Sequence, residues 1–368
     1  MQGKDPILML RGFLALALIW HHLGGMPLKV FGSDIAFIFW IPGRVIVWLF
    51  FVISGYSIYY GYRIQKYKFE LKDSLRFYFN RATRILPLFC LSVILTWIYF
   101  LYVSPQDVPT WQSIIRTMLF LDLNFYQGIF TFTPTWFIGV IVHFYLLAPI
   151  LVMGYIKMRG RLGIIPTFWS LIVFSVLCHL LGKKLSINTG DIRNFPGSAP
   201  LFLFGFFAYD LYNDDYPFKE KLHKILKSWL SYAVLFCLFE WIFFLYHKRN
   251  SDFWSYSFLE GLVGLIGAVL IVVLLLREPA DIHSENIIFK GLKALMDKSG
   301  KFSYGLYLWH SLVIMLILNT SMIFNAPPYE TTATFLSVFF LIVVISFCVS
   351  YIFHSIIEKP YQKLYKIG

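Results

Sequence analysis

Long apolar segments recur along the whole chain, and they constrain its fold more than any other feature. Ten of them are long and apolar enough to cross a membrane as helices: about 7–24, 35–62, 85–103, 134–156, 162–181, 198–213, 228–247, 256–276, 302–324 and 333–356. The sequence therefore predicts an all-α, polytopic integral membrane bundle of about ten transmembrane helices. We expect one transmembrane domain over 1–368 with no appended soluble domain.

Composition excludes other classes of protein. The 368 residues are 58% hydrophobic, 20% aromatic and 14% charged, which is too apolar for an ordinary soluble domain. The net charge of +12 would suit nucleic-acid binding only if the basic residues shared one soluble face, but they lie in short loops. The cysteines lie inside apolar segments without metal-site spacing, so we expect small core residues and no metal: Cys90, Cys178, Cys237 and Cys348.

The distribution of Lys and Arg predicts the orientation of the bundle. If alternate loops are assigned to opposite sides, 23 of the 32 basic residues fall on the side of the termini and seven on the other side. Lys and Arg in short loops remain in the cytoplasm, so both termini are predicted to be cytoplasmic. Two further stretches, Trp111–Leu121 and Ile287–Met296, have the pattern of helices that lie on the membrane surface.

The first apolar segment carries Arg11 near its start and His21 and His22 at its end. Arg11 and His22 are eleven positions apart, so in a helix they share one face within about 20° and lie roughly 16 Å apart along the axis. An arginine and an imidazole on one face of a membrane helix are expensive to place in lipid, which indicates a function. The alternative is that His22 caps the helix or lies at the interface.

Other polar groups in the apolar segments suggest a lined cavity. Arg44 is expected about ten residues into the second segment, where it would face a polar cavity or pair with an acidic group to pin two helices. Ser54 and Gly55, followed by Tyr56, could permit close helix packing or let a ligand approach the backbone. Further cavity candidates lie in the fourth and ninth segments, although each could equally be a packing residue: Trp136, His143, Tyr307 and His310.

Three arginines precede the third apolar segment. Arg81 and Arg84 are three residues apart and share one face of an expected helix start, and Arg76 lies about one turn earlier. Positive charge on the cytoplasmic side explains such a cluster in general terms. Forked guanidinium groups at a cytoplasmic entrance would also bind the phosphates of a nucleotide.

Taken in order, these motifs resemble the acyltransferase family 3 membrane proteins. The resemblance runs nearly end to end and rests on six stretches, which are Leu10-Arg11-Gly12 through His22, Phe50 through Tyr56, Arg81 through Pro87, Trp136 through Pro149, Phe302 through His310, and Ile357 through Pro360. It implies bacterial inner-membrane enzymes that move acyl groups from cytoplasmic acyl-CoA to surface sugars. It also implies that Arg11 and His22 are required for transfer and that Arg81 and Arg84 belong to the CoA side.

Two departures from the family pattern matter. Many members carry Glu and Gln in the fourth segment, where this chain has Ile141 and His143, so the resemblance implies no catalytic role there. Many members also append an extracytoplasmic hydrolase-like domain, whereas this chain ends at Gly368.

The expected activity is O-acetyl transfer from acetyl-CoA to a hydroxyl of O-antigen, exopolysaccharide or capsule. His22 would act as general base or, in a variant, as a nucleophile forming an acetyl-histidine. Arg44 or Tyr56 would stabilise the oxyanion, and Arg76, Arg81 and Arg84 would hold the CoA phosphates. The alternatives are a transporter of a lipid-linked sugar or small anion that uses the same residues, and an inactive assembly subunit.

Overall fold

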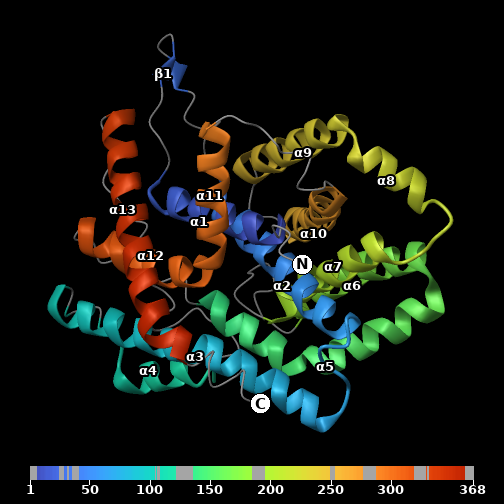
Figure 1. Ribbon diagram of the computed structural model, residues 1–368, viewed down its shortest axis with the longest axis horizontal. Helices are drawn as coiled ribbons and strands as arrows, with labels where there is room; N and C mark the ends of the chain where they lie inside the picture. Colours follow the sequence, from blue (N-terminus) through green and yellow to red (C-terminus); the bar gives the residue numbers. More distant parts are fainter. Residues whose placement is uncertain are drawn as a thin grey trace. The chain divides into compact units, whose positions relative to one another are not determined.

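The computed structural model describes residues 6–24, 29–30, 33–34, 41–103, 105, 108–121, 136–184, 195–248, 253–276, 287–318, 329 and 331–360. Figure 1 shows the helices, which are α1 (Pro6–His22), α2 (Gly43–Arg63), α3 (Leu71–Val103), α4 (Trp111–Met118), α5 (Trp136–Leu162), α6 (Ile164–Lys184), α7 (Phe195–Asn213), α8 (Lys219–Lys227), α9 (Trp229–Lys248), α10 (Phe253–Leu276), α11 (Ile287–Lys301), α12 (Ser303–Leu318) and α13 (Thr332–Phe353). A π-helical turn, His354–Glu358, extends α13.

The helical prediction is confirmed, because each of the ten apolar segments contains a helix. One short antiparallel pair of strands was not expected, β1 (Lys29–Val30) with β2 (Ser33–Asp34). Four of the described helices are individually long and apolar enough to cross a membrane: α2, α3, α5, and α13 with its π-helical turn. Up to two more spans arise if the bent pairs α8–α9 and α11–α12 each count as one, so the number ten stays a prediction.

Two helix starts differ from the prediction. Residues 41 and 42 are not helical, and α2 begins at Gly43 because the Pro42 carbonyl accepts the Val45 amide at 3.0 Å. The start of α3, Leu71, lies 14 residues before the expected start at 85. Its buried stripe continues upstream through Asn80 and Phe77 at helical spacing, while the charged residues on its other face lower the hydropathy of this part.

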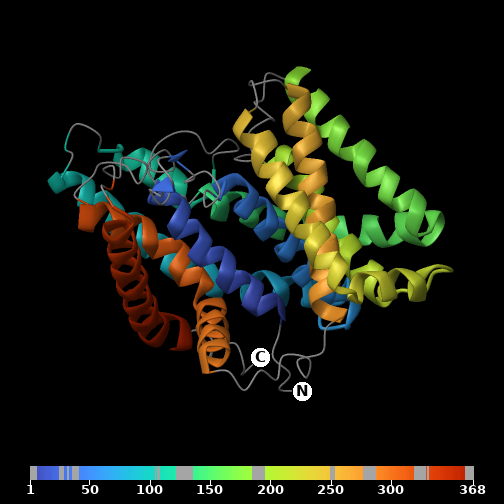
Figure 2. The same cartoon turned by 90° about the horizontal axis from the view of Figure 1, so that it is seen from above.

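The chain forms two compact units. Unit 1 consists of Met1–Ile7, Val47–Leu75 and His143–Lys290, and unit 2 consists of Leu8–Ile46, Arg76–Val142 and Gly291–Gly368. In unit 1, α7 packs on both α6 and α10, and α10 runs beside α9 (Figure 2). The α2–α7 crossing brings backbone against backbone, since the Cα of Gly55 faces the Phe202 carbonyl and Gly205 faces the Val52 carbonyl. Small residues at this crossing permit the close approach of two membrane helices.

Unit 2 is built on two further close crossings. Gly12 of α1 lies against the backbone of Met296 and Gly300 in α11, and Gly300 in turn faces the Leu8 carbonyl. α12 packs along α13, where Gly305 faces Ser350. Hydrogen bonds also join α3 to α12, because the Tyr99 hydroxyl donates to the Met315 carbonyl at 2.9 Å and the Tyr304 hydroxyl to the Ile85 carbonyl at 2.7 Å.

Helices form where surface helices were expected. α4 occupies most of Trp111–Leu121, and its first turn is capped by Thr110, whose hydroxyl accepts the Ser113 amide. α11 contains the whole of Ile287–Met296 and continues to Lys301. Their location on a membrane surface stays a prediction.

The prediction that the cysteines are core residues is only partly right. Cys178 is buried and Cys90 is half-buried, but Cys237 and Cys348 are exposed. These two exposed positions lie on apolar helices, α9 and α13, which also expose large apolar side chains such as Phe236 and Phe340. Such outward apolar faces suit contact with lipid rather than water.

The α2–α7 crossing gives a stability prediction. In Gly55→Ala the added methyl group overlaps the Phe202 carbonyl oxygen, which belongs to the backbone and cannot rotate away. We therefore expect the free energy of unfolding to fall by about 1–3 kcal/mol. The measurement is the midpoint of heat-induced loss of the monodisperse protein in detergent. Gly154→Ala is the matched control, since nothing lies near Gly154 in α5 and its stability should be unchanged or slightly higher. Equal midpoints for the two variants would contradict the contact.

Candidate functional site

Two histidines that are distant in the sequence stack on each other inside unit 2. The rings of His22, at the end of α1, and His310, in α12, have centroids 5.3 Å apart and an interplanar angle of 24°. Both side chains are buried, with 6% and 1% of their surface exposed. The sequence singled out each histidine separately, and the structure brings them together.

The orientation of His310 is fixed by its own helix. Its Nδ1 lies 3.0 Å from the Leu306 carbonyl oxygen. Because a carbonyl oxygen only accepts, Nδ1 must carry the proton, and in the neutral ring Nε2 is then an acceptor. The helix backbone therefore sets the tautomer of the histidine that packs against His22.

A row of aromatic rings extends from the histidine pair within unit 2. The Tyr307 ring lies 6.0 Å from His310, the Phe137 ring 5.2 Å from Tyr307, and the Trp136 ring 6.3 Å from Phe137. Three of the four predicted cavity residues, Trp136, Tyr307 and His310, thus belong to one row. The fourth, His143, is half-buried on the part of α5 that belongs to unit 1.

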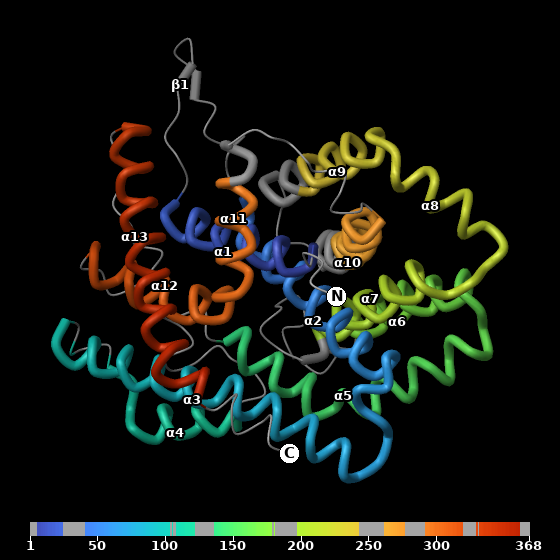
Figure 3. The backbone as a smooth tube through the Cα atoms, viewed as in Figure 1, coloured from blue at the N-terminus to red at the C-terminus, as the bar shows by residue number. Residues whose placement is uncertain are grey.

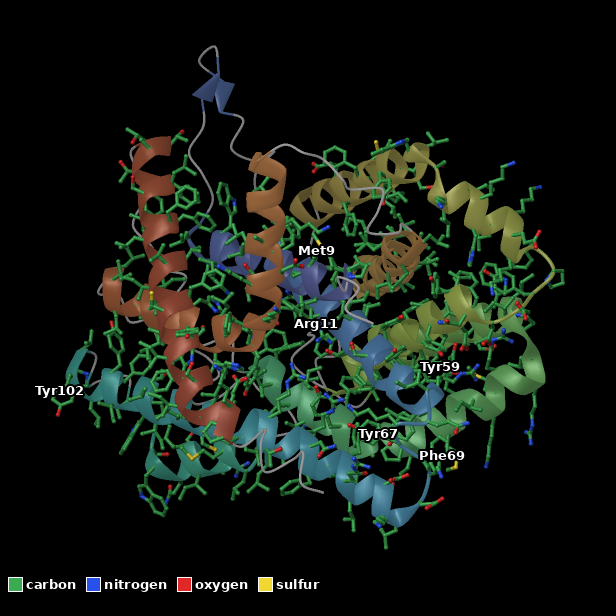
Figure 4. All side chains as sticks on the ribbon, in the orientation of Figure 1. Met9, Arg11, Tyr59, Tyr67, Phe69 and Tyr102 are labelled. Carbon is green, nitrogen blue, oxygen red and sulfur yellow. The ribbon has the colours of Figure 1, made fainter. Side chains whose placement is uncertain are left out.

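α1 is one unbroken helix from Pro6 to His22, so Arg11 and His22 share a face as the spacing predicted. Arg11 is half-buried and is labelled in Figure 4. His21 has a separate environment, because its ring lies against Gly43 and it forms a hydrogen bond with the Ile41 backbone. The two adjacent histidines therefore face different surroundings.

Arg44 does not lie where the sequence placed it. It was expected about ten residues into a helix that starts at 35, but α2 starts at Gly43, and Arg44 is in its first turn. The prediction took the apolar residues before Pro42 as part of the helix. Arg44 is half-buried, and its proposed part in the chemistry no longer rests on a position in the middle of a helix.

The three predicted phosphate-binding arginines lie on α3. Arg76 and Arg84 are exposed, whereas Arg81 is half-buried with its guanidinium carbon 5.4 Å from the centre of the Phe77 ring. They do not form a helix start, since α3 begins at Leu71 and they lie 5 to 13 residues further on. The spacing of three residues still puts Arg81 and Arg84 on one side of the helix.

The stretch Ser54-Gly55-Tyr56 lies at the α2–α7 crossing in unit 1. The face of Gly55 is filled by the backbone of Phe202, and the Tyr56 ring lies 6.0 Å from that of Tyr209. Ser54 is half-buried beside them. Helix packing therefore accounts for the glycine at this position.

Unit 1 also contains an ionic network that the sequence did not indicate. Asp210 of α7 has no exposed surface, and one of its carboxylate oxygens lies 3.6 Å from Arg159 Nε. Arg159 also contacts Asp214 at 3.3 Å, and Asp214 in turn accepts a hydrogen bond from Arg63 at 2.9 Å. Two acidic groups and two guanidinium groups from α2, α5 and the end of α7 thus compensate one another.

Tyrosine side chains complete this network. Tyr59, labelled in Figure 4, and Tyr155 both interact with the Asp210 carboxylate. The Arg63 guanidinium lies over the rings of Tyr59 and Tyr209, at 5.8 and 5.7 Å from their centres. The feature of the sequence that could have revealed this network was Asp210 itself, a carboxylate in an apolar helix. Charges there are almost always paired, but spacing alone did not reveal the partners.

Across the described residues, no three His, Cys, Asp or Glu side chains come together as a potential metal site. Apolar helices long enough to span a bilayer, with apolar outward faces and buried polar clusters, define a multi-pass helical membrane protein.

Comparison with known sequences agrees with this class and refines it. A family model described as an acyltransferase domain matches residues 7–355, and the chain belongs to this acyltransferase family 3. The O-acetyltransferase OatA of Staphylococcus aureus strain NCTC 8325 is 24% identical over 96% of this chain and 56% of its own length. The peptidoglycan O-acetyltransferase OatA of Listeria monocytogenes is 21% identical over 96% of this chain and 55% of its own length. The chain thus spans little more than half of these relatives, and no solved structure matches it.

The ionic network gives a second stability prediction. Asp210→Ala removes the buried carboxylate and leaves the half-buried Arg159 with Asp214 alone, so we expect the protein to lose about 1–3 kcal/mol of stability. The measurement is again the midpoint of heat inactivation in detergent.

A double variant separates the charge from the packing. Arg159→Met with Asp210→Leu removes both charges and should recover much of the loss. Asp215→Ala serves as the control, since this fully exposed carboxylate lies 3.3 Å from Lys219 Nζ in a surface ion pair, and its loss should leave the midpoint unchanged. A double variant that is as unstable as Asp210→Ala would refute the charge argument.

Proposed function

We propose that the protein is an integral membrane O-acetyltransferase that moves an acetyl group from cytoplasmic acetyl-CoA to a hydroxyl of a surface carbohydrate. The observation that supports it most strongly is the buried His22–His310 pair, with Arg11 on the same face of α1 as His22. Family membership supports acyl transfer as the class of reaction. The Listeria relative is named for peptidoglycan, so peptidoglycan joins O-antigen, exopolysaccharide and capsule as a candidate acceptor.

His22 is assigned as the general base. It takes the proton of the acceptor hydroxyl while the hydroxyl oxygen attacks the thioester carbonyl, and the CoA sulfur leaves with the pair of electrons. The proton then passes from His22 to that sulfur, so an acetyl ester and free CoA result. His310 acts as a positioning residue, because its fixed ring supports the face of His22. In the variant route, His22 carries the acetyl group itself before the acceptor attacks.

Arginines bind the donor in this proposal. Arg81 and Arg84, with Arg76 nearby on α3, hold the CoA phosphates on the cytoplasmic side by charge-assisted hydrogen bonds. Arg11 lies roughly 16 Å along α1 from His22, a distance that the pantetheine arm can cover. Arg44 is a candidate for stabilising the oxyanion. The Lys and Arg distribution supports both termini in the cytoplasm. The proposed location in the bacterial inner membrane follows from the resemblance to the acyltransferase family.

The base assignment predicts a specific loss of transfer. The purified protein is reconstituted in lipid and incubated with acetyl-labelled acetyl-CoA and candidate polysaccharides, and ester-linked label is measured. His22→Ala should lower transfer at least about 100-fold, the usual contribution of a general base. His21→Ala is the matched control, since its ring faces Gly43, and it should keep most of the activity. Full transfer by the His22→Ala variant would refute the assignment of His22 as the general base.

The same preparation distinguishes the enzyme from a transporter. An acyltransferase releases CoA in proportion to the ester formed. Accumulation of a lipid-linked sugar or anion in sealed vesicles without any release of CoA would refute acyl transfer and show that the protein is a transporter.

The donor site predicts weaker CoA binding. Arg81→Ala and Arg84→Ala each remove a charged partner of a phosphate, so we expect a rise in the CoA dissociation constant of roughly tenfold or more, measured by titration calorimetry in detergent. Arg161→Ala, at the exposed end of α5, removes the same charge elsewhere and should leave the affinity unchanged. Unchanged affinity in the first two variants would remove the phosphate assignment.

A further inference from the structure

α8 is a short helix with two different faces, and its role is not explained by the acyl transfer proposed above. The helix spans Lys219–Lys227 and lies in the loop between α7 and α9 in unit 1. Phe218, Leu222 and Ile225 follow one another at intervals of four and three residues, so they form a single apolar stripe. Lys221, Lys224 and Lys227 lie outside this stripe and are exposed.

Part of the apolar stripe is uncovered by the protein. Ile225 exposes 54% of its surface and Phe218 37%, while Leu222 is half-buried. Immediately beyond the helix, Trp229 exposes 78% and Leu230 70%. Leu226 is the residue of α8 that is buried against unit 1. An apolar strip of this kind in water would be a liability, so it indicates a contact outside the chain.

The bend between α8 and α9 decides what this contact is. The two helices meet at 77°. Figure 3 shows the backbone changing direction between them. α9 runs for 20 residues, long enough to cross a bilayer, and it exposes Phe236 and Val234. If α9 stands across the membrane, α8 must lie nearly in the plane of its surface. Trp229 then falls at the boundary between lipid and water, where tryptophan is enriched.

The corner is held rigidly by capping groups. The Ile225 carbonyl accepts hydrogen bonds from the hydroxyls of Ser228 and Ser231, both at 2.6 Å. The C-terminal turn of α8 is therefore tied to the first turn of α9. The angle between the two helices is thereby fixed locally.

The N-terminal half of α8 is tied to the end of α7. The Tyr216 hydroxyl donates to the Leu211 carbonyl at 2.8 Å, and His223 Nε2 donates to the same oxygen at 3.1 Å. Burial raises the pKa of Tyr216 to about 12, so its hydroxyl keeps its proton. Lys219 Nζ donates to the Asn213 carbonyl at 3.0 Å. α8 is therefore held at both ends, with its stripe and its lysines in defined directions.

We propose that α8 lies in the membrane interface and that Lys221, Lys224 and Lys227 bind the phosphate headgroups of anionic phospholipids, while Ile225 and Trp229 enter the acyl region. Charge complementarity favours anionic lipid as the partner of α8, since the helix has four lysines and one glutamate. These lysines also lie on the side that the Lys and Arg distribution places in the cytoplasm. Lys221 lies on the flank of the apolar stripe, whereas Lys224 and Lys227 lie nearer the face of Glu220 and would reach the headgroups through the length of their side chains.

The first test measures the depth of α8 in the full-length protein. With Cys90, Cys178, Cys237 and Cys348 replaced by Ala, a spin label is attached to Ile225→Cys or, as the control, to Glu220→Cys on the opposite face. In vesicles of phosphatidylcholine with phosphatidylglycerol, the label at 225 should be relaxed mainly by oxygen and the label at 220 mainly by a water-soluble nickel chelate. Equal exposure of the two labels to the nickel chelate would overturn the interfacial location.

The second test measures selectivity for anionic lipid. A fluorophore at Ile225→Cys should be quenched at least twofold more by brominated phosphatidylglycerol than by brominated phosphatidylcholine at the same mole fraction. The excess should vanish in Lys221→Gln/Lys224→Gln/Lys227→Gln. It should persist in Lys66→Gln/Lys68→Gln/Lys72→Gln, which removes three exposed lysines elsewhere in unit 1.

Each result bears on the proposal. Equal quenching by the two lipids, or loss of the excess in both triple variants, would overturn the headgroup assignment. Both triple variants are compared only as monodisperse protein with an unchanged midpoint of heat inactivation. A third variant, Lys221→Arg/Lys224→Arg/Lys227→Arg, should retain the excess quenching because it keeps the positive charge.

Discussion

A polar group buried in an apolar helical protein must find its partner inside the protein, and two polar clusters among the described residues obey that constraint. Asp210, with no exposed surface, is compensated by Arg159, which also contacts Asp214. His310 satisfies Nδ1 with the Leu306 carbonyl of its own helix and stacks on His22. The first cluster joins helices of unit 1, and the second joins α1 to α12 in unit 2. Each cluster therefore fixes how its helices pack.

Glycines provide the close approach on which these clusters depend. Gly55 and Gly205 bring α2 and α7 into backbone contact, and α2 and α7 carry Tyr59 and Asp210 of the ionic network. Gly12 and Gly300 do the same for α1 and α11. Without a side chain at these positions, dispersion contacts between backbones replace the hydrophobic effect, which does not drive helices together in lipid. The polar side chains can then reach across from one helix to the next.

The proposed chemistry and the membrane contact use the chain in different ways. The proposed transfer uses the buried imidazoles of unit 2, and a general base works best in a dry and rigid setting. The proposed membrane contact of α8 uses exposed lysines of unit 1. Their flexible side chains can reach lipid phosphates, and the negatively charged membrane surface attracts them. The bend of 77° between α8 and α9 serves the second purpose.

By itself, the sequence determined the helical class, ten helix-containing segments and the shared face of Arg11 and His22, because hydropathy and helical spacing are local properties. It misplaced the starts of α2 and α3, since charged residues on one face and apolar residues before Pro42 mislead a hydropathy pattern. Tertiary structure alone decided that His22 meets His310 and that Asp210 meets Arg159. These pairs join residues 288 and 51 positions apart, and no local pattern records which helix faces which.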